Sequence, residues 1–117
     1  MKTIYQQSKR CAQKWLAVFQ SCVEEQLHRT NLTAKKLAEL MSYSERQFYR
    51  KMKKLTGQSP SMLLKEARLQ RAYQYLKVGE YETVAETAKA VGFKDVVYFS
   101  RQFQKWFGVR PSKVKAA

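Results

Sequence analysis

The fold can be predicted from one stretch, residues 33–61, TAKKLAELMSYSERQFYRKMKKLTGQSPS. Its apolar side chains recur at helical spacing, and turn residues interrupt them. The pattern predicts a helix over 34–41, a turn at 42–44 and a second helix from 45 to about 56. Thr33 and Ser44 are suitable N-caps. Gly57 can adopt the left-handed conformation that ends a helix. Pro60 interrupts the chain again, and we expect the next helix to start near Ser61.

Each of these two helices has an apolar side and a charged side. In the first, we expect the buried side to consist of Leu37, Ala38, Leu40 and Met41. In the second, the core positions follow the spacing i, i+4, i+7 and are Phe48, Met52 and Leu55. The opposite side of the second helix is largely cationic and carries Arg46, Tyr49, Arg50 and Lys53.

The same arrangement returns in residues 83–112, TVAETAKAVGFKDVVYFSRQFQKWFGVRPS. Thr33 matches Thr83 with a shift of fifty, whereas Phe48 matches Phe99 with a shift of fifty-one, so one residue is inserted in the second turn. The helix-ending Gly and the breaking Pro also match, and so do the core positions, for which we expect Phe99, Phe103 and Trp106. The chain therefore contains a duplicated helix-turn-helix, joined by a long helix over about 61–77.

The composition supports a small, folded, all-α domain. The chain has 117 residues, 44% of them apolar and 13% aromatic, which disordered basic tails lack. Four Gly and two Pro are too few for the frequent turns of an all-β protein. Apolar runs stay well below the ~18 residues of a membrane span, and the N-terminus does not resemble a secretory signal. We expect a cytoplasmic protein.

The sequence offers little for catalysis or metal binding. Cys11, Cys22 and the single histidine, His28, do not form a four-ligand set at usual spacings. The thiols are most simply interpreted as buried or incidental. An acid–base cluster and a phosphate-binding loop are also lacking. We therefore expect a protein that is not an enzyme and that needs no cofactor or metal.

The charge balance indicates nucleic acid as the partner. Lys and Arg number 23 against 9 Asp and Glu, a net charge of +14. A short helix with a cationic exposed side fits the major groove of DNA, which is about 12 Å wide. Two such helices on one basic domain favour double-stranded DNA. The alternatives are RNA or an anionic membrane surface, although the chain lacks the aromatic sheet or the single cationic amphipathic helix that these partners usually require.

Several short motifs over about residues 15–113 form one recognisable set. They are Leu37-Ala38, Ser44, Phe48-Tyr49-Arg50, Gly57-Gln58-Ser59-Pro60, Arg68-Leu69 with Ala72 and Leu76, Gly92-Phe93, Tyr98-Phe99, Arg101, Phe103, Phe107-Gly108-Val109 and Pro111. Together they resemble the DNA-binding domains of AraC-type (arabinose-regulator-like) transcription factors. The resemblance implies about seven helices: one helix-turn-helix subdomain over about 33–56, a rigid linker helix over about 61–77, and a second subdomain over about 83–107. Residues 1–14 would form a linker or junction.

The residues that read bases are expected on the side of each second helix that is opposite its core. The matching family positions indicate the same side, namely Arg46, Tyr49 and Arg50 in the first unit and Val96, Val97, Ser100 and Arg101 in the second. An arginine fork can pair with guanine, and a valine can contact a thymine methyl group. For each arginine, a phosphate contact or a solvated charge is the alternative. The expected phosphate contacts are Ser44, Lys53, Lys54, Lys94, Gln104 and Lys105.

Two departures from the family pattern concern the turn and the second reading helix. Ser42 stands where a glycine is usual, although a tight turn tolerates serine. Val96 and Val97 stand where polar residues commonly begin the reading helix, which argues against hydrogen-bond readout there.

The tandem repeat also predicts how the domain is used. Because the two copies differ in their reading residues, a monomer should bind an asymmetric site that spans two adjacent major grooves, about 34 Å apart. In the resembling family such a domain often forms the C-terminal output part of a longer regulator, which could oligomerise, and RNA polymerase is a further candidate partner. The alternative is a self-sufficient small transcription activator.

Overall fold

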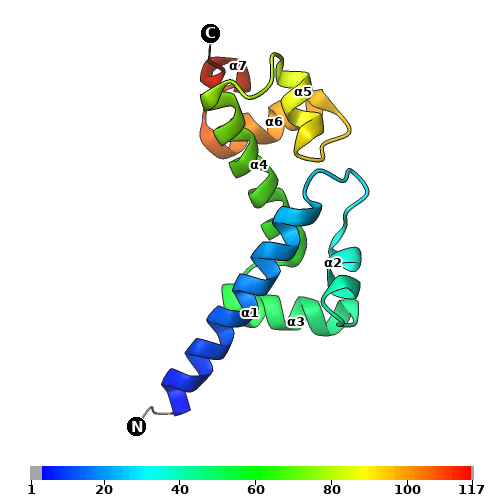
Figure 1. Ribbon diagram of the computed structural model, residues 1–117, viewed down its shortest axis with the longest axis vertical. Coiled ribbons are helices and arrows are strands. Elements are labelled where there is room, and N and C mark those ends of the chain that lie inside the picture. Colours follow the sequence, from blue (N-terminus) through cyan, green and yellow to red (C-terminus); the bar gives the residue numbers. More distant parts are fainter. Residues whose placement is uncertain (1–3, 117) are drawn as a thin grey trace.

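The protein is an elongated bundle of α-helices (Figure 1). The computed structural model describes the backbone of residues 4–116 and the side chains of residues 11–116. Within this part of the chain there are seven helices and no strand, as expected. Their bounds are α1 Ile4–Gln26, α2 Ala34–Leu40, α3 Glu45–Thr56, α4 Pro60–Val78, α5 Val84–Ala90, α6 Val96–Phe107 and α7 Pro111–Val114.

The internal duplication is evident in the lengths of the helices. Helices α2 and α5 each have 7 residues, and α3 and α6 each have 12. Residues 41–44 connect the first pair and residues 91–95 the second, which confirms the inserted turn residue. In both turns a backbone N–H reaches back to the same alanine position: Tyr43 donates to the Ala38 carbonyl at 2.8 Å, and Phe93 donates to the Ala88 carbonyl at 2.9 Å.

The ends of the repeated helices are capped in the same way. The Thr33 hydroxyl accepts a hydrogen bond from the Lys36 N–H, and the Thr83 hydroxyl accepts one from the Glu86 N–H. Gly57 and Gly108 end α3 and α6 with the same left-handed backbone, at φ 77°. These caps satisfy backbone groups that a helix end leaves unpaired, and thereby fix where the helices begin and end.

Each helix-turn-helix unit has a core of its own, and α4 contributes to both. The first core contains Phe19, Val23, Leu27, Leu32, Leu37, Ala38, Phe48, Met52 and Leu64. The second contains Leu69, Ala72, Leu76, Ala88, Val91, Phe93, Phe99 and Phe103. Because Leu64 and Leu69 lie on the same helix, α4 anchors the two units to one rigid element.

Two predicted bounds differ from the structure. Residues 1–14 were expected to form a linker or junction, but α1 begins at Ile4, so residues 4–14 are helical; residues 1–3 lie outside the described part. Helix α4 begins at Pro60 with Ser59 as its N-cap, rather than at Ser61. Proline suits the first helical position, since that residue's N–H has no partner within the helix and the ring fixes a helical φ.

Two predicted core residues are instead exposed. Leu40, the last residue of α2, is 53% exposed, whereas Met41, which was also predicted in the core, packs on it. Trp106 is 39% exposed. Phe107 closes that end of the second core, with its ring 4.6 Å from that of Phe103 and 4.8 Å from that of Tyr73.

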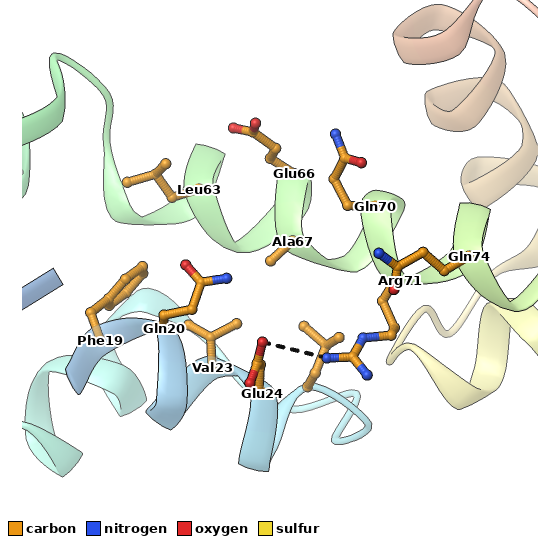
Figure 2. Close-up of a pocket in the computed structure, with 11 residues that line it drawn as sticks. Phe19, Gln20, Val23, Glu24, Leu63, Glu66, Ala67, Gln70, Arg71 and Gln74 are labelled. Carbon is orange, nitrogen blue, oxygen red and sulfur yellow. Dashed lines mark ion pairs between the residues drawn. The ribbon is translucent and has the colours of Figure 1, made fainter. Parts of the chain in front are cut away.

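A cleft of about 280 Å³ separates part of α1 from α4 (Figure 2). Phe19 and Val23 line it from α1, and the ion pair between Glu24 and Arg71, 3.6 Å long, crosses it. No residue of α3 or α6 lines this cleft. Among the described helices, none combines the length and the apolar content needed to cross a bilayer.

Candidate DNA-binding interface

Helix α3 presents the side that was predicted to read bases. Arg46 and Arg50 are exposed, and Tyr49 is 47% exposed. Their neighbours Phe48 and Met52 are buried in the first core. The amphipathic pattern therefore turns Arg46, Tyr49 and Arg50 outward together, and they line a shallow hollow on the surface of α3 with Glu45.

Helix α6 presents a more apolar surface. Val96 and Val97 are 39% and 57% exposed, Arg101 is exposed, and Ser100 is half-buried. Tyr98, which the sequence analysis did not select, is 48% exposed. The exposed side of α6 thus offers methyl groups and a phenol ahead of one guanidinium, whereas α3 offers two guanidinium groups.

Asp95 fixes the start of α6 and was not predicted from the sequence as an N-cap. Its carboxylate accepts hydrogen bonds from the backbone N–H groups of Val97 at 2.8 Å and Tyr98 at 3.3 Å. An aspartate directly before an apolar helical run is a recognised N-cap signal, so the sequence could have revealed it. The cap determines where Val96 and Val97 lie on the first turn of the helix.

The predicted phosphate-contacting residues are all exposed, but two of them also have roles in the fold. The Ser44 hydroxyl accepts from the Gln47 N–H at 3.2 Å, and the Gln47 side chain accepts from the Ser44 N–H, which completes a capping box. The Lys53 ammonium donates to the Gly57 carbonyl at 3.2 Å. The other predicted residues on this exposed surface are Lys54, Lys94, Gln104 and Lys105.

The positive charge of the domain is scarcely neutralised internally. Across residues 11–116 the one ion pair is between Arg71 and Glu24, on the cleft between α1 and α4. The cationic side chains of α3 and α6 therefore have no carboxylate partner in the described part of the chain. Such a surface attracts a polyanion and retains its affinity only at moderate salt.

A groove of about 570 Å³ lies between the two helix-turn-helix units. The first unit contributes the start of α2, α4 contributes Lys65 and Arg68, and the second unit contributes Lys94 and Tyr98. Arg68 was not selected from the sequence as a site residue. Burial lowers the pKa of its guanidinium below the ordinary value, and its hydrogen-bond acceptors are 36 and 39 residues away in sequence.

The two cysteines differ in their surroundings. Cys11 and Cys22 are free thiols; Cys11 is exposed and Cys22 is half-buried. Burial, and next the charge of Glu25, raise the pKa of the Cys22 thiol. A raised pKa keeps the thiol protonated and poorly nucleophilic.

Residues 37–117 match the family model of a helix-turn-helix domain, which covers more than half of the chain, beginning within α2 and including all of the second unit. The chain belongs to the AraC-type helix-turn-helix family. Members of this family are DNA-binding transcription regulators. The MmsAB operon regulatory protein of Pseudomonas aeruginosa is 33% identical over 90 residues, which are 77% of this chain and 29% of the relative. The chain spans about a third or less of the curated relatives it matches.

Solved structures of AraC-type domains share the same arrangement of helices. The C-terminal domain of the two-component response regulator yesN from Fusobacterium nucleatum superposes with a TM-score of 0.79 at 26% identity, covering 88% of this chain and 99% of that one. The DNA-binding domain of AdpA, solved in complex with a target DNA, gives a TM-score of 0.75 at 30% identity, with 84% and 86% covered.

Proposed function

We propose that this chain is the DNA-binding output domain of a bacterial transcription regulator and that it reads two successive major grooves of one asymmetric site. The observation that carries the proposal is the pair of exposed helices, α3 and α6, which occupy the same position in two duplicated units anchored to α4. Two reading helices on one rigid element can engage one face of a duplex without dimerisation.

The two helices are proposed to contribute different kinds of contact. Arg46 and Arg50 would pair with guanine edges, and Tyr49 would lie between them. In the second unit, Val96 and Val97 would contact thymine methyl groups and Arg101 a guanine or the backbone, with half-buried Ser100 beside them. Ser44, Lys53, Lys54, Lys94, Gln104 and Lys105 would contact phosphates. Because the two surfaces differ chemically, the preferred site should lack two-fold symmetry.

The size of the relatives supports an output domain within a longer protein. The chain matches about a third or less of the length of two curated transcription regulators. It also matches 7% of a much longer relative, histidine kinase P4 of Formosa agariphila. We infer that this domain is cytoplasmic and contacts DNA as a monomer. It needs no metal or cofactor and has no catalytic activity. A sensor elsewhere in the protein would control it, and RNA polymerase would be its partner at the promoter.

Selection of binders from a random duplex library tests this proposal. The expected result is a motif of two conserved blocks of different sequence, whose centres are about one helical turn, or ~10 base pairs, apart. A palindromic motif would contradict the asymmetric reading. Equal retention of duplex RNA of the same length would favour the RNA alternative.

A further inference from the structure

Arg68 lies on α4 at the point where the two cores meet. Ala67, one residue before it, packs on the first core, and Leu69, one residue after it, belongs to the second. A bend or twist of α4 at this position would rotate one helix-turn-helix unit relative to the other. Contacts of Arg68 with both units would oppose that rotation.

On the side of the first unit, Arg68 holds the loop between α1 and α2. Its Nη2 donates hydrogen bonds to the carbonyl of Arg29 at 2.9 Å and to the carbonyl of Leu32 at 3.4 Å. These acceptors follow the end of α1 and precede α2. The guanidinium therefore links the linker helix to the backbone from which α2 starts.

On the side of the second unit, the same guanidinium lies against the turn between α5 and α6. A Cβ atom at Gly92 would lie 3.0 Å from Arg68 Nε and 3.1 Å from its Cζ, and would collide with the Leu27 carbonyl oxygen. The backbone of the second turn is thus in direct contact with the end of α1. Arg68 Nε is buried there and has no hydrogen-bond partner among the described residues.

The duplication separates two constraints on this glycine. Ser42 occupies the matching position of the first turn with a left-handed φ of 64°, so that turn accommodates a side chain despite the backbone strain. Gly92 has a left-handed φ of 92°, which strains any side chain, and a Cβ there would in addition meet Leu27 and Arg68 of the neighbouring unit.

A second polar contact joins α4 to the second unit. The Lys65 ammonium donates to the Gln102 side chain on α6 at 3.1 Å. Lys65 lies one turn of α4 before Arg68, next to Leu64 of the first core. Two cationic side chains of α4 thus make contacts that cross from one unit to the other.

The guanidinium of Arg68 lies between the 27–32 segment and Gly92, and we call this set of contacts the clasp. We propose that Arg68 is a positioning residue that sets the angle between the two reading helices and hence the spacing of the DNA site. This inference rests on the proposed function. When two linked modules bind one target, affinity depends on whether their geometry allows simultaneous engagement. Loss of the clasp should therefore affect binding to two blocks and leave binding to each block unchanged.

The test compares three variants with the wild-type chain. Arg68→Met removes the guanidinium and keeps an apolar stem. Arg68→Lys keeps the charge but loses the planar fork. Gly92→Ala introduces the colliding Cβ, and Gly108→Ala is its matched control, because Gly108 has φ 77° and has no atom within 4 Å of the position of a Cβ. Circular dichroism and thermal melting verify that each variant is folded at the assay temperature.

The probes are the two-block duplex that the wild-type chain selects, the same duplex with either block scrambled, and versions with one base pair added or removed between the blocks. We expect Arg68→Met, Arg68→Lys and Gly92→Ala to bind the two-block duplex about tenfold or more weakly. They should bind each single-block duplex like the wild type and discriminate less between spacings. Gly108→Ala should keep the wild-type spacing preference.

Three results would overturn the proposal. Wild-type affinity and spacing preference in Arg68→Met and Gly92→Ala would show that the clasp does not position the units. Equal losses on single-block and two-block duplexes would show a local defect. Rescue by Arg68→Lys would show that a positive charge is sufficient and that the planar guanidinium against Gly92 does not position the units. Failure of the wild-type chain to select two blocks would instead refute the proposed function, and with it this inference.

Discussion

The indole N–H of Trp15 donates a hydrogen bond to the Tyr43 hydroxyl at 3.0 Å, which ties α1 to the turn that precedes α3. The two rings meet edge to face, with centroids 5.8 Å apart and planes at 86°. The Lys51 ammonium lies 5.3 Å from the centre of the Trp15 ring and 5.8 Å from that of Tyr43. Helix α1 therefore supports the turn that leads into α3.

Substitution of this pair should reduce stability in a coupled way. Trp15→Phe and Tyr43→Phe each remove one partner of a partly buried hydrogen bond, and each should lower the free energy of unfolding by about 1 kcal/mol. The double variant should lose less than the sum, with a coupling of about 0.5–1 kcal/mol. Urea denaturation of the four proteins measures the cycle, and strictly additive losses would show that the bond contributes nothing.

Arg50→Ala should relax base preference without unfolding the domain. Arg50 is exposed on α3, so the free energy of unfolding should change by less than about 0.5 kcal/mol. Discrimination at one base pair of the selected duplex should fall by about 1–3 kcal/mol. Competition binding with single-base variants of the duplex measures this effect.

Lys54→Ala is the matched control on the same helix. It should weaken binding to all sequences about equally and reduce the salt slope by about one unit. If Arg50→Ala instead weakens all sequences equally, Arg50 contacts phosphate. If Arg50→Ala unfolds the domain, the role of Arg50 is structural.

The core and the exposed side of α6 should respond differently to truncation. Phe99 is fully buried between Phe93 and Phe103, with ring centroids 5.1 and 5.6 Å away, so Phe99→Ala should cost about 3–5 kcal/mol through the cavity it leaves. Val97→Ala should cost less than about 0.5 kcal/mol, because Val97 is 57% exposed. Thermal melting compares the two, and similar losses would mean that the exposed side of α6 is packed in solution.

Affinity for DNA should fall steeply with salt. If about seven phosphates are neutralised, the slope of log K against log salt should be near −6, since each contact contributes about −0.9. Filter binding of the selected duplex between about 50 and 200 mM salt measures the slope. A slope near zero would remove the electrostatic basis of binding.

Local patterns in the sequence predicted most of the fold. Both units were placed correctly from the spacing of Phe48 and Met52 and of their counterparts, Phe99 and Phe103. This was possible because helical periodicity and caps are encoded within a few residues. The exposure of Arg46 and Arg50 followed from the same periodicity. Their roles in DNA binding stay predictions.

Contacts between distant segments could not be predicted. Nothing near Arg68 in sequence indicates that its guanidinium binds the carbonyls of Arg29 and Leu32, more than 30 residues away. The position of Trp106 was misjudged because a helical stripe does not show where the core ends, and in the structure Phe107 closes it. Residues 4–14 were expected to form a linker rather than the first turns of α1, because they lack a continuous apolar stripe.

Hydroxyl-radical footprinting of the selected duplex shows whether both α3 and α6 contact the DNA at the same time. If α3 and α6 enter successive major grooves, protection should extend over about two helical turns on one face of the DNA, in two blocks about 10 base pairs apart. Val97→Arg, a bulky change on the exposed side of α6, should remove the protection of one block only. Protection of a single turn by the wild-type chain would show that α3 and α6 do not enter successive grooves.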